Sequence, residues 1–316
     1  MDRTAGGRGR EWLARVALVL LALGFALLLA ELTLRISGLR YDRMPFVSDP
    51  VLHHALPRDY HYISEDPDGV LPAFAITYDD LGRPADPDVG RRARAGAPCR
   101  IALIGDSFTV ANEVPYRSSF AGLLDAASPC EVRNFAVGSY SPMLHGLLWR
   151  ERIAAFKPDL VIIQIFSNDI WDDQVYAKSA RRDGAGRVTA VPGASGEGFA
   201  EWRRRLYVAR LLRRATSAVQ WWWQNRGRAQ TSIDGYVEEN PELTELSLAE
   251  MRRLVADIRA ANVPLLLTVV PSKVRLLTGT MPGPAKTEFA ERWQAWAERE
   301  GVRFVDLVAP FHAAKA

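Results

Sequence analysis

The stretch Ile101-Ala-Leu-Ile-Gly-Asp-Ser-Phe-Thr109 decides the fold of this 316-residue chain. Its apolar half is typical of a buried strand, and the small polar residues Gly105, Asp106 and Ser107 predict a strand end followed by a turn. A helix-like segment follows at about 115–127. Ser107 is therefore expected at the carboxyl end of a strand, where open α/β sheets carry their binding and catalytic residues.

Ser107 has two interpretations at such a place. The commoner one is structural, because serine often caps the first turn of a helix. The chemical one is a nucleophile, because a helix N-terminus offers free N–H groups and positive potential to a developing oxyanion. This stretch alone leaves both open, and the other strand ends must decide between them.

The rest of the chain predicts strands alternating with helices. Further strands are expected at 131–135, 159–166, 263–270 and 302–307, and further helices at about 143–156, from 247, and at 284–300. Ser247-Leu-Ala-Glu250 has the pattern of a capping box that opens the second of these helices. Such alternation predicts an α/β fold with a parallel sheet and right-handed crossovers.

The N-terminus predicts a membrane segment. Four arginines within residues 3–15 precede an unbroken apolar run from Val16 to Ala30, and with its flanks the segment approaches the ~20 residues that a spanning helix needs. A cleaved secretory signal begins in the same way. We expect an uncleaved anchor instead, because Glu31-Leu-Thr-Leu-Arg35 continues the helix. The basic flank predicts that the N-terminus lies in the cytoplasm. The residues after about 38 are then expected on the exported side of the membrane.

Composition narrows the class of protein only slightly. Hydrophobic residues make up 48% of the chain, charged residues 24%, and the formal net charge is +3, which is ordinary for a globular protein and gives no reason to expect nucleic acid as a partner. His53, His54 and His61 lack the usual spacing of metal ligands, so we expect no metal and no cofactor.

Two segments flank or interrupt the alternation. Residues 38–98 are rich in Pro, Asp, Arg and Tyr, and we interpret them as a connecting arm packed on the domain. An insertion at 171–245 contains an expected loop at 179–198 and then an Arg-rich segment with Trp221-Trp-Trp223. That basic segment is either a cap over the sheet or a helix in a membrane interface.

The two cysteines, Cys99 and Cys130, each come just before a predicted strand. If these strands are neighbours, both sulfurs lie at the amino-terminal edge of the sheet. An oxidising compartment would permit a disulfide between them, and two independent buried thiols are the alternative.

Polar residues follow two other predicted strands. Asn134-Phe-Ala-Val-Gly138 comes at the end of the second strand and Asn168-Asp169 at the end of the third. In a doubly wound sheet these turns lie beside Gly105-Asp106-Ser107 on one edge. A serine that attacks an ester creates an oxyanion, which backbone N–H groups and an asparagine amide can stabilise. The three turns make chemical sense as one site.

These blocks make the chain resemble the SGNH hydrolase family, also called GDSL-like hydrolases. The first block of that family matches Gly105-Asp106-Ser107, the glycine-donor block matches Asn134 to Gly138, and the asparagine block matches Asn168-Asp169, with Phe166 in place of the usual glycine. The resemblance covers about residues 98–310. It implies a flavodoxin-like three-layer fold with a five-stranded sheet in order 2-1-3-4-5, and it implies Ser107 as nucleophile with Ser107, Gly138 and Asn168 as oxyanion donors.

The last block of the family, Asp-x-x-His, carries the general base and its orienting acid, and it has no match here. His312 lies six residues after Asp306 rather than three. His145 lies on a predicted helix, and its position there does not place the imidazole next to Ser107. We therefore expect domain 99–316 to be C-terminally incomplete or degenerate, and slow in turnover.

Three functions follow from the resemblance. The first is a membrane-anchored, exported esterase or deacetylase that works through a Ser107 acyl-enzyme. The second is an O-acyltransferase that acts on a cell-envelope polysaccharide, and the third is a non-catalytic carbohydrate-binding or scaffold protein. The expected partners are an acyl-ester or acetylated glycan and a lipid bilayer. The expected location is the bacterial inner membrane, with residues 1–37 forming the tip and anchor and the hydrolase-type domain in the periplasm.

Overall fold

A computed structural model describes residues 5–37, 46–64, 72–86, 96–193, 206–209, 211–212, 215–216, 219, 241–270, 289–307 and 310–311. The chain divides into two compact units, 1–43 with 196–229 and 44–195 with 230–316. The second unit holds the sheet and the candidate site.

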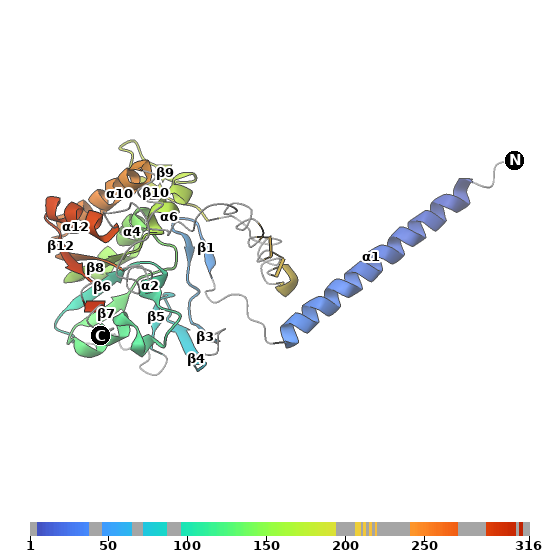
Figure 1. The fold of residues 1–316 in the computed structure, drawn as a ribbon, viewed down its shortest axis with the longest axis horizontal. Helices are drawn as coiled ribbons and strands as arrows, with labels where there is room; N and C mark the ends of the chain where they lie inside the picture. The colour runs from blue at the N-terminus through green and yellow to red at the C-terminus, as the bar shows by residue number, and fades with distance from the viewer. Residues whose placement is uncertain are drawn as a thin grey trace. The chain divides into compact units, whose positions relative to one another are not determined.

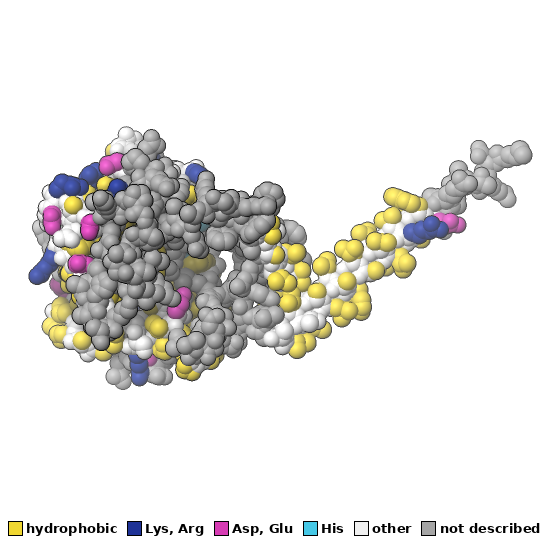
Figure 2. Space-filling view, viewed as in Figure 1, with side chains coloured by type: hydrophobic (Ala, Val, Ile, Leu, Met, Phe, Trp, Pro, Cys, Tyr) yellow, Lys and Arg dark blue, Asp and Glu magenta, His cyan; other side chains and the backbone are white. Residues whose placement is uncertain are grey.

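The first unit contains one long helix, α1 (Ala5–Ile36). Its stretch Glu11–Ile36 is long and apolar enough to cross a membrane, although a signal sequence would meet the same criteria. Hydrophobic side chains are exposed along this stretch, as Figure 2 shows. Near its end, the Glu31 carboxylate accepts hydrogen bonds from the Arg35 side chain (2.8 Å) and from the Val208 N–H (3.0 Å).

The centre of the second unit is a five-stranded parallel sheet in the order β7-β6-β8-β11-β12 (Figure 1). The strands are β7 (Glu131–Asn134), β6 (Arg100–Ile104), β8 (Leu160–Ile165), β11 (Leu265–Val269) and β12 (Arg303–Asp306). In chain order this is 2-1-3-4-5, so the predicted fold class and strand order are confirmed. Each strand lies within two residues of its predicted bounds.

Helices cover both faces of this sheet. Side chains alternate along each strand, so neighbouring residues of one strand pack on opposite faces. Ala102 and Ile104 face the larger cluster of buried side chains, which includes residues of α4 (Pro142–Leu148), α10 (Pro241–Ala260) and α12 (Phe289–Arg299). Ile101 and Leu103 face a smaller cluster with α3 (Phe120–Ala127), which follows the 3-10 turn η1 (Tyr116–Ser118). The helix α4 continues through the π-helical turn η2 (Trp149–Ile153) into α5 (Ala154–Phe156).

The predicted capping box at Ser247 is wrong. The helix α10 begins earlier, at Pro241, and proline suits the first turn of a helix because the missing N–H would have no intrahelical partner. Ser247 therefore lies inside the helix, where its buried hydroxyl donates to the Asp173 carboxylate. Glu250 accepts from Arg182 (2.9 Å) and Arg253 (2.8 Å) instead of capping.

The segment before the sheet forms short strands. β1 (Val47–Asp49) pairs with β2 (His53–Ala55), and β3 (Tyr60–Ser64), β4 (Phe74–Tyr78) and β5 (Pro84–Ala85) form an antiparallel sheet. Leu52, Leu56 and Tyr78 are almost fully buried in the larger core cluster. These residues are therefore part of the hydrophobic core.

The described start of the insertion is also ordered. α6 (Asp169–Ala177) leads to β9 (Arg181–Arg182), which pairs with β10 (Val188–Ala190), where a loop over 179–198 was predicted. Val188 and Val191 are buried, which explains why the chain returns to the core here. The tryptophans Trp221-Trp-Trp223 lie outside the described residues.

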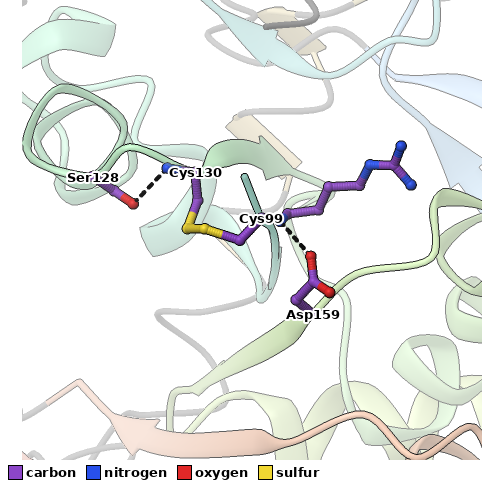
Figure 3. The surroundings of a disulfide bond; sticks show 5 residues. Cys99, Ser128, Cys130 and Asp159 are labelled. Carbon is purple, nitrogen blue, oxygen red and sulfur yellow. Dashed lines mark hydrogen bonds between the residues drawn. A yellow bond between two sulfur atoms is a disulfide. The ribbon is translucent and has the colours of Figure 1, made fainter. Parts of the chain in front are cut away.

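A disulfide joins Cys99 to Cys130, with their Cα atoms 4.5 Å apart (Figure 3). Both cysteines precede paired strands, since Arg100 is the register partner of Glu131. Ser128 Oγ accepts from the Cys130 N–H (3.1 Å), and the Asp159 carboxylate accepts from the Arg100 N–H (2.8 Å). The bond lies at the amino-terminal edge of the sheet, opposite the strand ends that carry the candidate site.

Candidate active site

Ser107 is the first residue of α2 (Ser107–Val110), which follows β6 after a two-residue turn. The N-cap of this helix is Asp106, whose Oδ1 accepts from the Phe108 N–H (2.9 Å). Ser107 therefore does not serve as the cap. Its side chain is half-buried, and no hydrogen bond joins its hydroxyl to another described residue.

Position 105 requires glycine because two buried side chains lie very close to its Cα. A Cβ on this residue would lie 2.1 Å from Thr109 Oγ1 and 3.0 Å from Gln164 Oε1. Those two groups are fully buried, and the Thr109 hydroxyl, in α2, donates to the Gln164 side chain of β8. The glycine thus lets the Ser107 turn fold tightly onto the neighbouring strand.

The turn after β7 is hydrogen-bonded to the Ser107 turn. The Val137 N–H donates to the Gly105 carbonyl (3.3 Å), and the Asn134 side chain donates to the Thr109 carbonyl (2.7 Å). The Tyr140 N–H closes the turn on the Val137 carbonyl (3.1 Å). Gly138 is buried in this turn, and its N–H makes no hydrogen bond to another described residue.

Asn168 follows β8, which pairs with β6 on the side away from β7. Its Nδ2 donates to Asp172 Oδ2 (3.0 Å), one turn further along α6. A primary amide carries two N–H donors, so this bond orients the group and leaves one N–H free of Asp172. Ser107, Gly138 and Asn168 thus follow three neighbouring strands at one edge of the sheet.

Four aspartates surround this edge. Burial, together with repulsion from Asp106, Asp172 and Asp173, raises the pKa of Asp169 well above its usual range. Burial and the same kind of repulsion raise the pKa of Asp172 to about 7, and burial raises the pKa of Asp106 to about 6. The raised pKa of Asp169 favours its neutral form, which limits negative charge where an oxyanion would form.

Asp173 has a structural role. It is fully buried and accepts from Ser141 Oγ, the Met143 N–H (3.0 Å) and Ser247 Oγ. These bonds join α6 to α4 and α10, so the helix that begins beside Asn168 is held at a fixed position against the core.

The described histidines do not contact the Ser107 hydroxyl. His145 is wholly buried in α4, and neither ring nitrogen has a hydrogen-bond partner of good geometry among the described residues. Burial lowers the pKa of His145 to about 3, partly opposed by an interaction with the Gly105 backbone. His312 lies outside the described residues.

Aromatic rings flank the nucleophile turn. The rings of Phe108 and Phe166 lie 4.3 Å apart between centroids, and Phe108 is exposed. Phe166 occupies the position where the resemblance predicts glycine, and its ring packs against that of Phe108, the residue next to Ser107.

Sequence reasoning missed two residues of this site. Asp172 could have been found from its position four residues after Asn168, since such pairs face each other on a helix. His54, whose ring reaches the Gly138 carbonyl (2.8 Å), follows no pattern that points to the site, because 84 residues separate the two.

Comparison with known proteins identifies the protein family of this chain. The model of the GDSL-like Lipase/Acylhydrolase family matches residues 103–316, so the chain belongs to that family, whose members are ester-acting hydrolases. No curated protein matches the chain.

Similar solved structures include a catalytic mutant of Axe2, an acetylxylan esterase from Geobacillus stearothermophilus. It is 18% identical, covers 69% of this chain and 80% of its own, and has a TM-score of 0.37. Another is a putative lipolytic protein of the G-D-S-L family from Desulfitobacterium hafniense DCB-2, which is 15% identical, covers 66% and 77%, and has a TM-score of 0.35.

Proposed function

We propose that this chain is a serine hydrolase that acts on ester bonds through a Ser107 acyl-enzyme. The main supporting observation is that the turn after β6, which contains Ser107, is hydrogen-bonded to the turn after β7, which contains Gly138. The Ser107 hydroxyl is free of described partners at the start of α2, while the adjoining turn, bonded to Gly105, carries a buried Gly138 N–H that is also free. A nucleophile beside unused backbone donors is the arrangement that acyl transfer requires.

In the proposed reaction the Ser107 oxygen attacks the acyl carbon and loses its proton to a base. The ester carbonyl oxygen becomes an oxyanion, which accepts from the N–H groups of Ser107 and Gly138 and from the free N–H of Asn168. Collapse breaks the bond to the alcohol, which leaves with a proton and gives an acyl-enzyme. Water then releases the acid, or a sugar hydroxyl takes the acyl group.

No described residue hydrogen-bonds to the Ser107 hydroxyl, so the general base of the reaction is not identified among the described residues. A serine hydroxyl without a base still reacts slowly when the oxyanion donors are in place, because the donors contribute independently of proton transfer. The acyl-enzyme step is therefore the one to test first.

A fluorophosphonate that carries a reporter tests this step on the full chain in detergent. The wild type should take one label, Ser107→Ala should take none, and Ser118→Ala, which changes an exposed serine of η1, should label like the wild type. A folded wild type that takes no label would contradict the proposal and favour a non-catalytic scaffold.

Acetylated oligosaccharide offered with and without a sugar acceptor then separates hydrolysis from transfer. Release of free acetate that an acceptor does not reduce supports an esterase. Appearance of acetylated acceptor in its place would make the protein an O-acyltransferase that uses the same serine.

We also propose that α1 anchors the protein in a bacterial inner membrane, with the N-terminus in the cytoplasm and the hydrolase domain exported. The apolar stretch of α1 and the basic residues before it support this orientation. The Cys99–Cys130 disulfide is consistent with export, because such bonds persist in oxidising compartments.

A further inference from the structure

The turn that carries Gly138 is held from outside by residues far away in the sequence. His54, in β2, lies with its Nε2 2.8 Å from the Gly138 carbonyl oxygen, and the Tyr140 hydroxyl donates back to the His54 carbonyl (2.6 Å). The Tyr176 hydroxyl, from α6, donates to the Ser139 carbonyl (2.8 Å). With the Tyr140 N–H on the Val137 carbonyl, three successive carbonyls of the turn are occupied.

This turn needs external support because its backbone is strained. Ser139 has a φ of 62°, in the left-handed region that residues other than glycine adopt only with steric strain. Without its hydrogen bonds, the Gly138–Ser139 peptide would be free to rotate away from this conformation. The Gly138 N–H belongs to the preceding peptide, Val137–Gly138, which meets this one at the Gly138 Cα. A fixed Gly138–Ser139 peptide therefore also fixes one end of the peptide that carries the N–H.

Burial lowers the pKa of His54 to about 4, which favours the neutral ring, and the contacts of that ring then set its tautomer. Nε2 must carry a hydrogen to donate to a carbonyl, so in the neutral ring Nδ1 is an acceptor. The Nδ1 of His53 lies 2.9 Å from the Nδ1 of His54 and therefore donates to it. The His54 ring is only 9% exposed and packs edge-on against the rings of Phe46 and Tyr140, which fixes its orientation.

We propose that His54 is a positioning residue for the oxyanion hole, its Nε2–H holding the Gly138 carbonyl so that the Gly138 N–H points at the reacting oxygen. This rests on the proposed function of Ser107. The segment before the sheet then takes part in catalysis through the turn that it holds. His54 itself touches neither the substrate nor Ser107.

The rate of phosphonylation tests this inference, because the phosphonate forms the same type of oxyanion. In His54→Leu the limiting rate of inactivation should fall ~10- to 100-fold, less than the ~100- to 1,000-fold that loss of an oxyanion donor itself costs, because the Gly138 N–H is misplaced but still present. The concentration of probe that gives half of that rate should stay the same. The final labelled fraction of folded protein should also stay the same. In His54→Gln the amide N–H replaces the imidazole donor and should restore most of the rate.

Two further variants make the outcome decisive. Tyr176→Phe removes only the hydroxyl that holds the Ser139 carbonyl and should slow labelling without unfolding the protein, whereas His61→Leu, at an exposed position of β3, should label like the wild type. A labelled wild type with an unchanged rate in His54→Leu would overturn the inference alone, as would a rate that His54→Gln fails to restore. A wild type that takes no label would overturn the proposed function and this inference with it.

Discussion

Gly105 shows how strongly one residue constrains the nucleophile turn. A methyl group at this position would collide with the buried Thr109 hydroxyl, and the β-branched threonine has little freedom to move away. Gly105→Ala should lower the free energy of unfolding by about 1–3 kcal/mol and displace Ser107. Thermal unfolding measures the first effect, and phosphonate labelling measures the second.

Gly184 provides the matched control for this substitution, because no atom lies within 4 Å of a Cβ placed there. Gly184→Ala should unfold and label like the wild type. Equal behaviour of the two variants would show that close packing does not shape the Ser107 turn.

His145 makes the stability of the domain sensitive to acid. Burial lowers its pKa to about 3, so between that pH and about 6.5 the unfolded chain binds a proton that the folded protein does not. Stability due to this group is therefore lost as the pH falls through that window, by at most ~1.4 kcal/mol per pH unit.

Replacement of this ring by an apolar side chain should remove the loss. The unfolding midpoint of His145→Leu, measured from pH 7 to pH 4, should rise relative to that of the wild type as the pH falls. His61→Leu changes a surface histidine and should follow the wild type throughout. Parallel curves for wild type and His145→Leu would contradict the buried neutral ring.

The strands were predictable from the sequence because their physical signal is local. Ile101 to Ile104 are apolar on both faces and Leu160 to Ile165 are apolar except for Gln164, as expected of central parallel strands. The hairpin of β9 and β10 gave no such signal, since its first strand is only Arg181–Arg182 and its burial comes from Val188 and Val191.

The site was predictable only in part, for the same reason. Ser107, Gly138 and Asn168 each follow a recognisable strand, so their meeting at one edge could be expected. The ring of His54 reaches Gly138 across 84 residues, and nothing near either residue indicates that contact. The capping-box prediction at Ser247 failed because a serine followed three residues later by glutamate also occurs inside helices. There the hydroxyl can bond to a residue of another helix, as Ser247 does to Asp173 of α6.

The disulfide ties the start of β6 to the start of β7. It closes a loop with a sequence separation of 31, and a chain-entropy model gives a stabilisation of about 3–4 kcal/mol for a loop of that length. Reduction should lower the denaturant midpoint of the wild type, and Cys99→Ala with Cys130→Ala should match the reduced protein. A midpoint that reduction leaves unchanged would show that the bond does not stabilise the folded domain.

At the scale of the whole chain, the proposed anchor would determine the compartment in which the hydrolase domain lies. If Glu11–Ile36 spans a bilayer, the protein should remain with membranes after a carbonate wash, and protease should reach the hydrolase domain only from the exported side. Release of a soluble species cleaved near Ala30 would instead identify a signal peptide.

In the proposed reaction Ser107 attacks an ester beside N–H donors supplied by two neighbouring strand ends. A crystal structure of the phosphonate adduct would show whether the reacting group lies among these donors. We expect phosphorus on Ser107 Oγ and one phosphoryl oxygen about 2.7–3.1 Å from the backbone nitrogens of Ser107 and Gly138 and from Asn168 Nδ2. An adduct on another residue, or a phosphoryl oxygen that points to solvent away from Gly138 and Asn168, would contradict the account.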